Sequence, residues 1–337
     1  MSGKKYGLLF PGQGSQTIGM CKEFYQTQTA CRWVFDRANE ILGRDIAKLC
    51  FEGPEDELMT TANSQPAIFT ASIAALNVLI EKLKASPVGE EGREIFSSED
   101  IRSVASVSMG LSLGEPTALV ACGAISFEDG LRFVRERGLL MEQAAKKDPG
   151  KMASIIGLDL EKVEELCVGV GCQVANLNCP GQVVISGSAE KIELAADLAK
   201  SQGAKRVVVL KVSGAFHSRL MSPAKEKLKT FLETIEIKEP VIDFISNIDA
   251  ELTRNPVKIK ENLADQLDNK TLWEASVEKA ASLGITDYLE VGPGTVLKGL
   301  FKKIDRSLNV FTVHTLEDIG IINKNMSDEA TCHASEN

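Results

Sequence analysis

The segment Gly110-Leu-Ser-Leu-Gly114 carries the clearest chemical signal in the sequence. It fits the pattern G-x-S-x-G, in which the glycines allow a sharp turn that pushes a serine hydroxyl out of the top of a sheet. The backbone N–H of Leu113, at the start of the following helix, can then face a developing oxyanion. The pattern predicts that Ser112 is a nucleophile, with an ordinary turn between a strand and a helix as the alternative.

A serine nucleophile needs a base, usually a histidine, within hydrogen-bond reach. The chain has three histidines, namely His217, His314 and His333. His333 lies in a polar C-terminal stretch, which makes it a poor catalytic candidate. His314 ends a strand-like run whose position relative to Ser112 is not fixed by the sequence. His217 lies in a turn of small residues that could aim it at Ser112, although a histidine on a surface loop would have the same surroundings.

The composition restricts the remaining possibilities. The 337 residues suggest about two domains, and a net charge of −9 argues against a nucleic-acid binder. No apolar run approaches the ~18 residues that a membrane span needs, and no signal peptide is apparent, so we expect a cytoplasmic protein without a membrane partner. The eight cysteines lack zinc-type spacing, which predicts reduced, mostly buried thiols and no metal site.

Alternating strands and helices must position the candidate residues. We expect strands over 6–11 and 104–109, helices over 30–42, 66–83 and 127–145, and a surface loop over 85–100. Residues 152–212 follow the order strand, helix, strand, strand, helix, strand, which is typical of a ferredoxin-like (βαββαβ) unit. The sequence therefore predicts an α/β fold with a parallel sheet, in which a core of residues 1–148 and 213–317 is interrupted by a small domain over 149–212. Residues 318–337 are polar and aperiodic, and we expect a flexible tail there.

Seven short motifs, running from residue 6 to about 304, resemble those of the malonyl-CoA:acyl-carrier-protein transacylases and occur in the same order. The motifs are Phe10-Pro-Gly-Gln-Gly-Ser-Gln16, Asn63-Ser-Gln-Pro-Ala67, Gly110-Leu-Ser-Leu-Gly-Glu115, Arg137-Gly-Leu-Leu-Met141, Asn176-Leu-Asn-Cys-Pro-Gly-Gln-Val-Val184, Gly214-Ala-Phe-His-Ser218 and Glu290-Val-Gly-Pro-Gly294. The resemblance implies an α/β-hydrolase-like core with a ferredoxin-like insertion. It also implies transfer of malonyl groups from malonyl-CoA to acyl carrier protein in fatty acid biosynthesis, with the CoA thioester as substrate and no cofactor.

The resemblance also assigns roles to individual residues. It makes Ser112 the nucleophile and His217 its base, and it places the backbone N–H groups of Gln13 and Leu113 in the oxyanion hole. The residues that it assigns to substrate binding are Arg137 for the malonyl carboxylate, Gln65 for the acyl group, Asn176 for the CoA or carrier arm, and Phe216 for malonyl selectivity. An arginine fork suits a carboxylate better than lysine does, although an exposed helical arginine would be the simpler interpretation of Arg137 without the motif order.

Several positions depart from the family pattern, namely Leu111, Pro116, Lys211 and Ala275, and two of them bear on the catalytic histidine. Leu111 replaces a histidine that usually precedes the nucleophile, which leaves His217 as the clear base. Ala275 occupies the place of a frequent glutamine whose main-chain carbonyl is thought to orient the catalytic histidine, and we expect the Ala275 carbonyl to serve instead. No acidic third member of a catalytic triad is evident in the sequence.

Other functions remain open at this stage. A serine esterase or thioesterase could use the same elbow, but it should carry an HGGG-like oxyanion loop, which the sequence lacks. A catalytically silent assembly domain should have lost Ser112, His217 or Arg137. The sequence argues against phosphate binding at Gly12–Gly14, because no Gly-Lys-Ser/Thr follows. Because carrier proteins are typically acidic, docking needs a basic patch, and the residues just beyond His217 could form one, namely Arg219, Lys225, Lys227 and Lys229. The solvated face of a helix would carry the same residues and stays open as the alternative.

Overall fold

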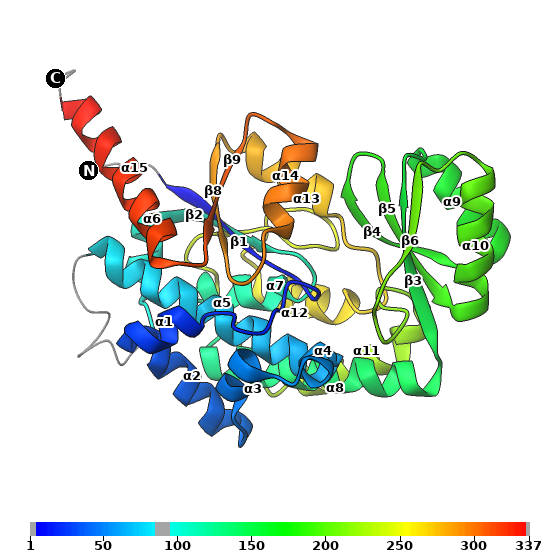
Figure 1. Cartoon of the computed structure of the whole chain (residues 1–337), viewed down its shortest axis with the longest axis horizontal. Coiled ribbons are helices and arrows are strands. Elements are labelled where there is room, and N and C mark those ends of the chain that lie inside the picture. The colour runs from blue at the N-terminus through cyan, green and yellow to red at the C-terminus, as the bar shows by residue number, and fades with distance from the viewer. Residues whose placement is uncertain (1–4, 85–94, 335–337) are drawn as a thin grey trace.

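The computed structural model describes residues 5–84 and 95–334, in which two sheets and their helices form an elongated molecule (Figure 1). The elements, in chain order, are β1 (Tyr6–Phe10), α1 (Lys22–Thr27), α2 (Thr29–Leu42), α3 (Ile46–Glu52), α4 (Glu55–Met59), α5 (Thr61–Lys84), α6 (Ser98–Val104), β2 (Ala105–Gly110), α7 (Gly114–Ala121), α8 (Phe127–Lys147), β3 (Gly150–Ile156), α9 (Leu160–Val170), β4 (Gln173–Cys179), β5 (Gln182–Ser188), α10 (Ala189–Ser201), β6 (Arg206–Val209), α11 (Ser222–Leu232), β7 (Asp243–Phe244), α12 (Pro256–Asp265), α13 (Trp273–Ser282), β8 (Asp287–Val291), α14 (Val296–Ile304), β9 (Asn309–Val313) and α15 (Leu316–Ala334).

The larger sheet is parallel and has the strand order β7-β2-β1-β8-β9. Strand β1 lies at its centre and is buried along its whole length. Its side chains alternate, so Leu8 and Phe10 pack into the apolar core formed with α2, α5 and α8, whereas Leu9 packs on the other side with residues of α13 and α14. Because both faces of the sheet are covered by helices, its strands are almost continuously apolar.

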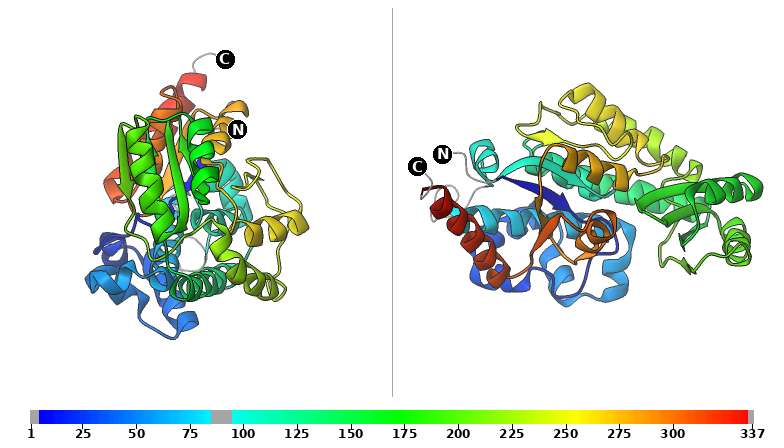
Figure 2. Two further views of the ribbon diagram at one scale, coloured as in Figure 1. Left: turned by 90° about the vertical axis from the view of Figure 1, so that its right-hand side faces the viewer. Right: turned by 90° about the horizontal axis from the view of Figure 1, so that it is seen from above.

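The smaller sheet is antiparallel, with the order β4-β5-β3-β6. Strand β3 pairs with β5 and β6, as a βαββαβ unit requires. Helices α9 and α10 bury their apolar faces against this sheet in a core of their own. The unit lies at the end of the molecule opposite to the two termini, which is seen most clearly from above (Figure 2, right). The predicted α/β fold with a parallel sheet and a ferredoxin-like unit is confirmed.

The predicted tail over 318–337 is wrong for the residues that the structure describes. Helix α15 continues to Ala334, and Ile319 and Ile322 are buried against the core. Two apolar residues three positions apart on one helical face were enough to dock a segment whose composition is otherwise polar. Of the loop predicted over 85–100, residues 85–94 lie outside the described part of the chain, and α6 already begins at Ser98.

Helix α5 is long and apolar enough, by length and composition, to cross a membrane, which corrects the expectation that no segment approaches that length. However, 83% of its apolar window is buried inside the fold. It packs between α2 and α8 as the central helix of the larger core. This placement explains the composition, because a helix that is covered on all sides is apolar on all sides.

Candidate active site

Ser112 lies in the turn that joins β2 to α7, at the carboxyl end of a central parallel strand. Its φ of 51° is in the left-handed region, which a serine adopts only when its surroundings enforce it. The turn is tight because a Cβ at Gly114 would overlap the carbonyl oxygen of Phe10. This close approach brings the loop after β1, which carries Gln13, against the elbow.

His217 approaches Ser112 from a turn beyond β6, 105 residues further along the chain. The His217 Nε2 atom lies 2.8 Å from Ser112 Oγ. The histidine is buried, and its own φ of 57° is left-handed as well. His314, by contrast, follows β9 and contacts the backbone of Gly294. The structure therefore brings the predicted nucleophile together with His217 and not with His314.

The carbonyl oxygen of Gln266, at the end of α12, lies 2.7 Å from His217 Nδ1. A carbonyl can only accept a hydrogen bond, so Nδ1 carries the proton and Nε2 is free to accept one from Ser112. Burial, assisted by the nearby Arg137, lowers the pKa of His217 to about 4, which keeps the ring neutral at pH 7. The expectation that Ala275 orients this histidine is wrong, because the chain brings Gln266 to that position.

Arg137 projects from α8 to the same serine. Its side chain is 1% exposed, and its Nη2 atom lies 3.1 Å from Ser112 Oγ and 2.8 Å from Gln266 Oε1. Its Nη1 atom donates to Gln65 Oε1 over 2.9 Å. Burial lowers the pKa of the guanidinium to about 10, so it stays charged at pH 7. The interpretation of Arg137 as an exposed helical charge is therefore wrong.

Gln65, Gln13 and Leu113 surround this group. Gln65 is fully buried on α5 and joins Arg137 to Met141, whose sulfur accepts from Gln65 Nε2. The Gln13 side chain donates to Thr61. Within residues 5–84 and 95–334, the backbone N–H groups of Gln13 and Leu113 donate to no protein acceptor, which leaves both available for a ligand oxygen.

Asn176 and Phe216 have different surroundings, since Asn176 bonds to Thr271 and Phe216 packs in the larger core. Asn176 is on β4, and its side chain donates to Thr271 Oγ1 over 2.5 Å, which ties the antiparallel sheet to the loop before α13. Among the described residues it makes no hydrogen bond to Ser112, His217 or Arg137. Phe216 directly precedes His217 and is buried in the larger core.

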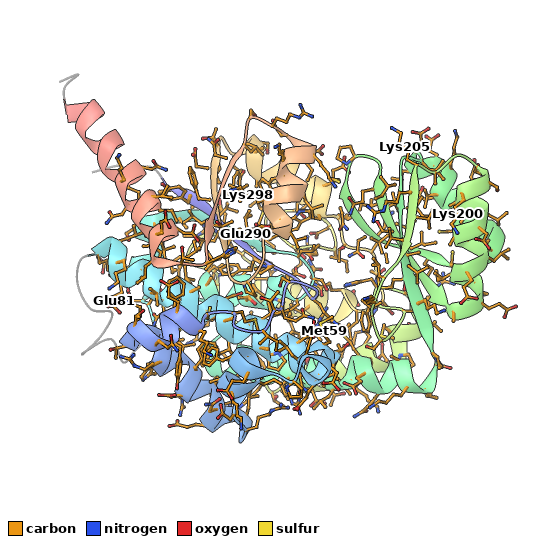
Figure 3. All side chains as sticks on the ribbon, viewed as in Figure 1. Met59, Glu81, Lys200, Lys205, Glu290 and Lys298 are labelled. Carbon is orange, nitrogen blue, oxygen red and sulfur yellow. The ribbon has the colours of Figure 1, made fainter. Side chains whose placement is uncertain are left out.

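Glu290 lies on β8 beside the start of α14. Its carboxylate accepts from the backbone N–H groups of Leu297 and Lys298 at 2.9 and 2.8 Å and so caps α14 (Figure 3). The turn between them holds Gly292 at a φ of 128°, where a Cβ would lie 3.1 Å from Pro11 Cγ. Only glycine suits this position, and the turn packs against the loop that carries Gln13.

Three residues of the site were not predicted with a role. Gln266, Asn247 and Glu115 form hydrogen bonds around Ser112. Only Glu115 could have been noticed in the sequence, because it ends the motif Gly110–Glu115. Asn247 Oδ1 accepts from the Ser112 N–H over 2.7 Å, and Asn247 Nδ2 donates to Gly110 O. Asn247 and Gln266 are 135 and 154 residues from Ser112 along the chain, so local spacing could not reveal them.

The predicted basic patch is only partly available. Lys225 forms ion pairs with Asp265 and Asp268 at 2.7 and 3.1 Å, and its side chain is 15% exposed. It thus stabilises the loop that carries Gln266 and does not present a free charge. Arg219 and Lys227 are exposed, and Lys229 is exposed but pairs with Glu226.

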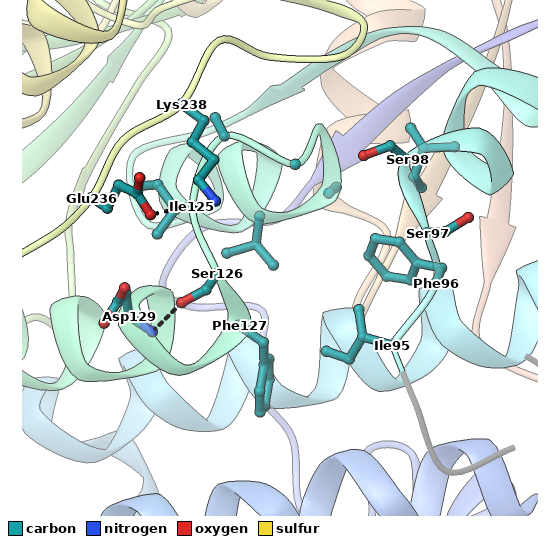
Figure 4. A pocket seen from close by; sticks show the side chains of 15 residues that line it. Ile95, Phe96, Ser97, Ser98, Ile125, Ser126, Phe127, Asp129, Glu236 and Lys238 are labelled. Atoms are coloured by element: carbon teal, nitrogen blue, oxygen red, sulfur yellow. Dashed lines mark hydrogen bonds and ion pairs between the residues drawn. The ribbon is translucent and has the colours of Figure 1, made fainter. Parts of the chain in front are cut away.

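A separate cavity of about 230 Å³ lies beside the turn between α7 and α8 (Figure 4). Apolar side chains such as Ile95, Phe96 and Phe127 line much of it. Its polar groups are engaged locally, since Ser126 accepts from the Asp129 N–H and Lys238 pairs with Glu236. None of the predicted site residues lines this cavity, and the described residues contain no cluster of metal-binding side chains.

Comparisons with known proteins agree with this geometry. Residues 94–334 match the family described as the acyl transferase domain. A malonyl CoA-acyl carrier protein transacylase of Bacillus subtilis is 43% identical and is covered over 98% of its length, with 96% of this chain aligned. An acyl-carrier-protein S-malonyltransferase structure from Burkholderia pseudomallei is 38% identical, covers 95% of this chain and 99% of its own, and gives a TM-score of 0.86.

A further solved structure shows a type II PKS acyl-carrier protein in complex with its malonyl-transacylase. The matched chain is 36% identical, with a TM-score of 0.87 and coverage of 96% of this chain and 100% of its own. These matches extend over nearly the whole sequence, including both sheets. This chain is an acyltransferase that belongs to the family of malonyl CoA-acyl carrier protein transacylases.

Proposed function

We propose that this chain transfers malonyl groups from malonyl-CoA to acyl carrier protein, for fatty acid biosynthesis, through a malonyl ester on Ser112. The observation that carries the proposal is a single hydroxyl held between a neutral base and a buried guanidinium. Ser112 Oγ lies 2.8 Å from His217 Nε2 and 3.1 Å from Arg137 Nη2. A base at that distance can take the hydroxyl proton, and a guanidinium at that distance can bind a carboxylate carried by the acyl group.

The first half-reaction forms the ester. His217 Nε2 accepts the Ser112 proton as Oγ attacks the thioester carbonyl, and the backbone N–H groups of Gln13 and Leu113 stabilise the resulting oxyanion. The carbonyl re-forms, the C–S bond breaks, and His217 returns the proton to the departing CoA thiolate. The malonyl carboxylate meanwhile binds Arg137, with Gln65 fixing the other end of the guanidinium.

The second half-reaction reverses these steps with a different thiol. His217 takes the proton of the phosphopantetheine thiol of the carrier protein, and the thiolate attacks the malonyl ester. Ser112 then leaves and recovers its proton from His217. The thioester supplies its own activation, so the proposed chemistry uses no resident cofactor. Free thiols at all seven described cysteines fit the proposed cytoplasmic location.

Arg137 also separates this proposal from an esterase or thioesterase. A fully buried arginine is costly unless it meets an anion or enough acceptors. An enzyme that hydrolyses simple esters has no use for such a charge beside its nucleophile. A malonyl ester does, because its free carboxylate can pair with the guanidinium.

Isotope exchange between CoA and malonyl-CoA tests the proposed two-step mechanism. We expect labelled CoA to enter malonyl-CoA in the absence of carrier protein, because the first half-reaction is reversible on its own. A heat-inactivated sample serves as the control. If exchange requires carrier protein, the transfer is direct and the malonyl ester on Ser112 is not an intermediate.

We further propose that Arg219 and Lys227 belong to the surface that receives the acidic carrier protein. Both side chains are exposed close to the His217 turn. Reversing both charges to glutamate should raise the KM for carrier protein about 10-fold and leave the KM for malonyl-CoA unchanged. The matched control is reversal of the exposed Lys302 on α14. If reversal of Lys302 raised the KM for carrier protein as much as reversal of Arg219 and Lys227, the docking surface would lie elsewhere.

A further inference from the structure

Glu115 is a buried carboxylate for which the proposed chemistry has no use. It lies in the first turn of α7, three residues after the nucleophile, and is 1% exposed. Its Oε1 atom accepts from the Asn247 N–H over 3.0 Å, and its Oε2 atom accepts from Gln266 Nε2. The Ser246 hydroxyl is a further hydrogen-bond partner. A carboxylate that is this well supplied with donors has a defined orientation.

One oxygen of Glu115 is connected to the nucleophile through the hydrogen bonds of Asn247. This oxygen accepts from the Asn247 backbone N–H. The Asn247 side chain in turn accepts from the Ser112 N–H and donates to Gly110 O, both over 2.7 Å. Asn247 thus spans the elbow from one side of Ser112 to the other. The left-handed φ of Ser112 needs this kind of external support.

The other oxygen is connected through Gln266 to the base His217 and to Arg137, which binds the malonyl carboxylate in the proposed function. Gln266 donates from Nε2 to Glu115 and, over 3.1 Å, to Ser112 O, and it accepts at Oε1 from Arg137 Nη2. Its backbone carbonyl accepts from His217 Nδ1. One residue therefore touches the groups that act as base, nucleophile and anion binder.

The direction of the Gln266 amide depends on Glu115. An ionised carboxylate only accepts hydrogen bonds, so Nε2 must point toward it and Oε1 toward the guanidinium. If a glutamine replaced Glu115, its amide would place a donor against either Gln266 Nε2 or the Asn247 N–H. Turning the Gln266 amide to avoid this would direct its NH₂ group at Arg137, so two buried donors would face each other in every arrangement.

We infer that Glu115 is a positioning residue whose two oxygens, acting through Asn247 and Gln266, set the relative placement of Ser112, His217 and Arg137. This inference rests on the proposed function, because it concerns the placement of the groups that form the malonyl ester. It assigns the carboxylate a place in catalysis without contact with the substrate.

The required charge makes the arrangement sensitive to pH. Burial raises the pKa of Glu115 to about 7, against the opposing effect of its donors and of Arg137. The charged group that acts on it is Arg137 from α8, and the titratable His217 shares Gln266 with it as a neighbour. Ser246, Asn247 and Gln266 do not titrate. Protonation would turn an acceptor into a donor and disturb the Gln266 amide. Acylation should then weaken as the pH falls through about 7, well above the pKa of His217, which is about 4.

The experiment measures single-turnover acylation of the full chain by intact mass between pH 5 and 8.5. The substrate is the malonyl thioester of N-acetylcysteamine, which has no phosphate that titrates in this range. We expect the wild-type rate to fall as the pH drops through about 7. Glu115→Gln should be slower by about 100-fold at pH 8, the size of effect that a misplacement of about 1 Å can produce, and should show no decline near pH 7.

The control is Glu290→Gln, because Glu290 is buried and its pKa is likewise raised to about 7. The decline near pH 7 should persist in this variant. A wild-type rate that declines only near pH 4, a decline that survives in Glu115→Gln, or its loss in Glu290→Gln would each overturn the inference. If Glu115→Gln does not fold, the wild-type and Glu290→Gln profiles together still test the inference, because both rates must decline near pH 7. Absence of any adduct in the wild type would instead contradict the proposed function.

Discussion

Replacing Arg137 by alanine is expected to lower kcat/KM for malonyl-CoA by about 10³-fold, which corresponds to about 4 kcal/mol, while acetyl-CoA turnover falls far less. Removing one partner of a buried hydrogen-bonded charge pair typically costs 2–5 kcal/mol. The Arg137 side chain is 1% exposed and forms hydrogen bonds to Gln65 and Gln266 as well as Ser112. Bulk water therefore cannot replace these hydrogen bonds when the side chain is removed. Acetyl-CoA has no free carboxylate on its acyl group, so the variant removes no ion pair with this substrate. The preference for malonyl over acetyl should therefore collapse.

Two further variants make this prediction specific. Arg137→Lys keeps the charge but loses the planar fork, and we expect an intermediate preference. Arg132→Ala removes an exposed arginine of the same helix, which forms an ion pair with Asp129, and should leave the preference unchanged. Competition assays with both thioesters measure all three variants. An unaltered preference in Arg137→Ala, with acetyl turnover showing that the protein is folded, would refute the role of Arg137.

Local patterns were sufficient for the elements and for the sharp turn that carries Ser112. The apolar strand before Gly110, the paired glycines and the helix after Gly114 are all short-range features, and the structure reproduces them at β2 and α7. The order of strands and helices over 152–212 likewise predicted the ferredoxin-like unit, because each element has its own period. His217 emerged largely because the chain has few histidines.

The groups that connect the site could not be found in this way. Gln266 belongs to no recognisable pattern, and its carbonyl reaches His217 because α12 ends beside that turn. The expectation for Ala275 failed because it relied on a matched position in a family motif and not on where α12 ends. Lys225 failed as a docking residue for a similar reason: its partners Asp265 and Asp268 are 40 and more residues away. Such contacts are products of tertiary packing, which single-sequence spacing does not encode.

Replacing Ser112 by alanine should abolish transfer, with kcat reduced by at least about 10⁴-fold, as expected when an enzyme loses its nucleophile. Alanine also has a Cβ, so the left-handed φ of 51° costs no more than in the wild type and the fold should persist. Binding of malonyl-CoA should survive, because Arg137 retains Gln65 and Gln266 as partners. Denaturant unfolding provides the control for stability. Transfer at the wild-type rate by this variant would exclude Ser112 as the nucleophile.

The most direct test of the whole account is the intact mass of the wild-type chain after mixing with malonyl-CoA, followed by addition of carrier protein. The account predicts a mass increase of one malonyl group, carried on the peptide that contains Ser112. It also predicts that the thiol of the carrier protein discharges this adduct faster than water does. An adduct on another residue, or one that only water removes, would contradict it.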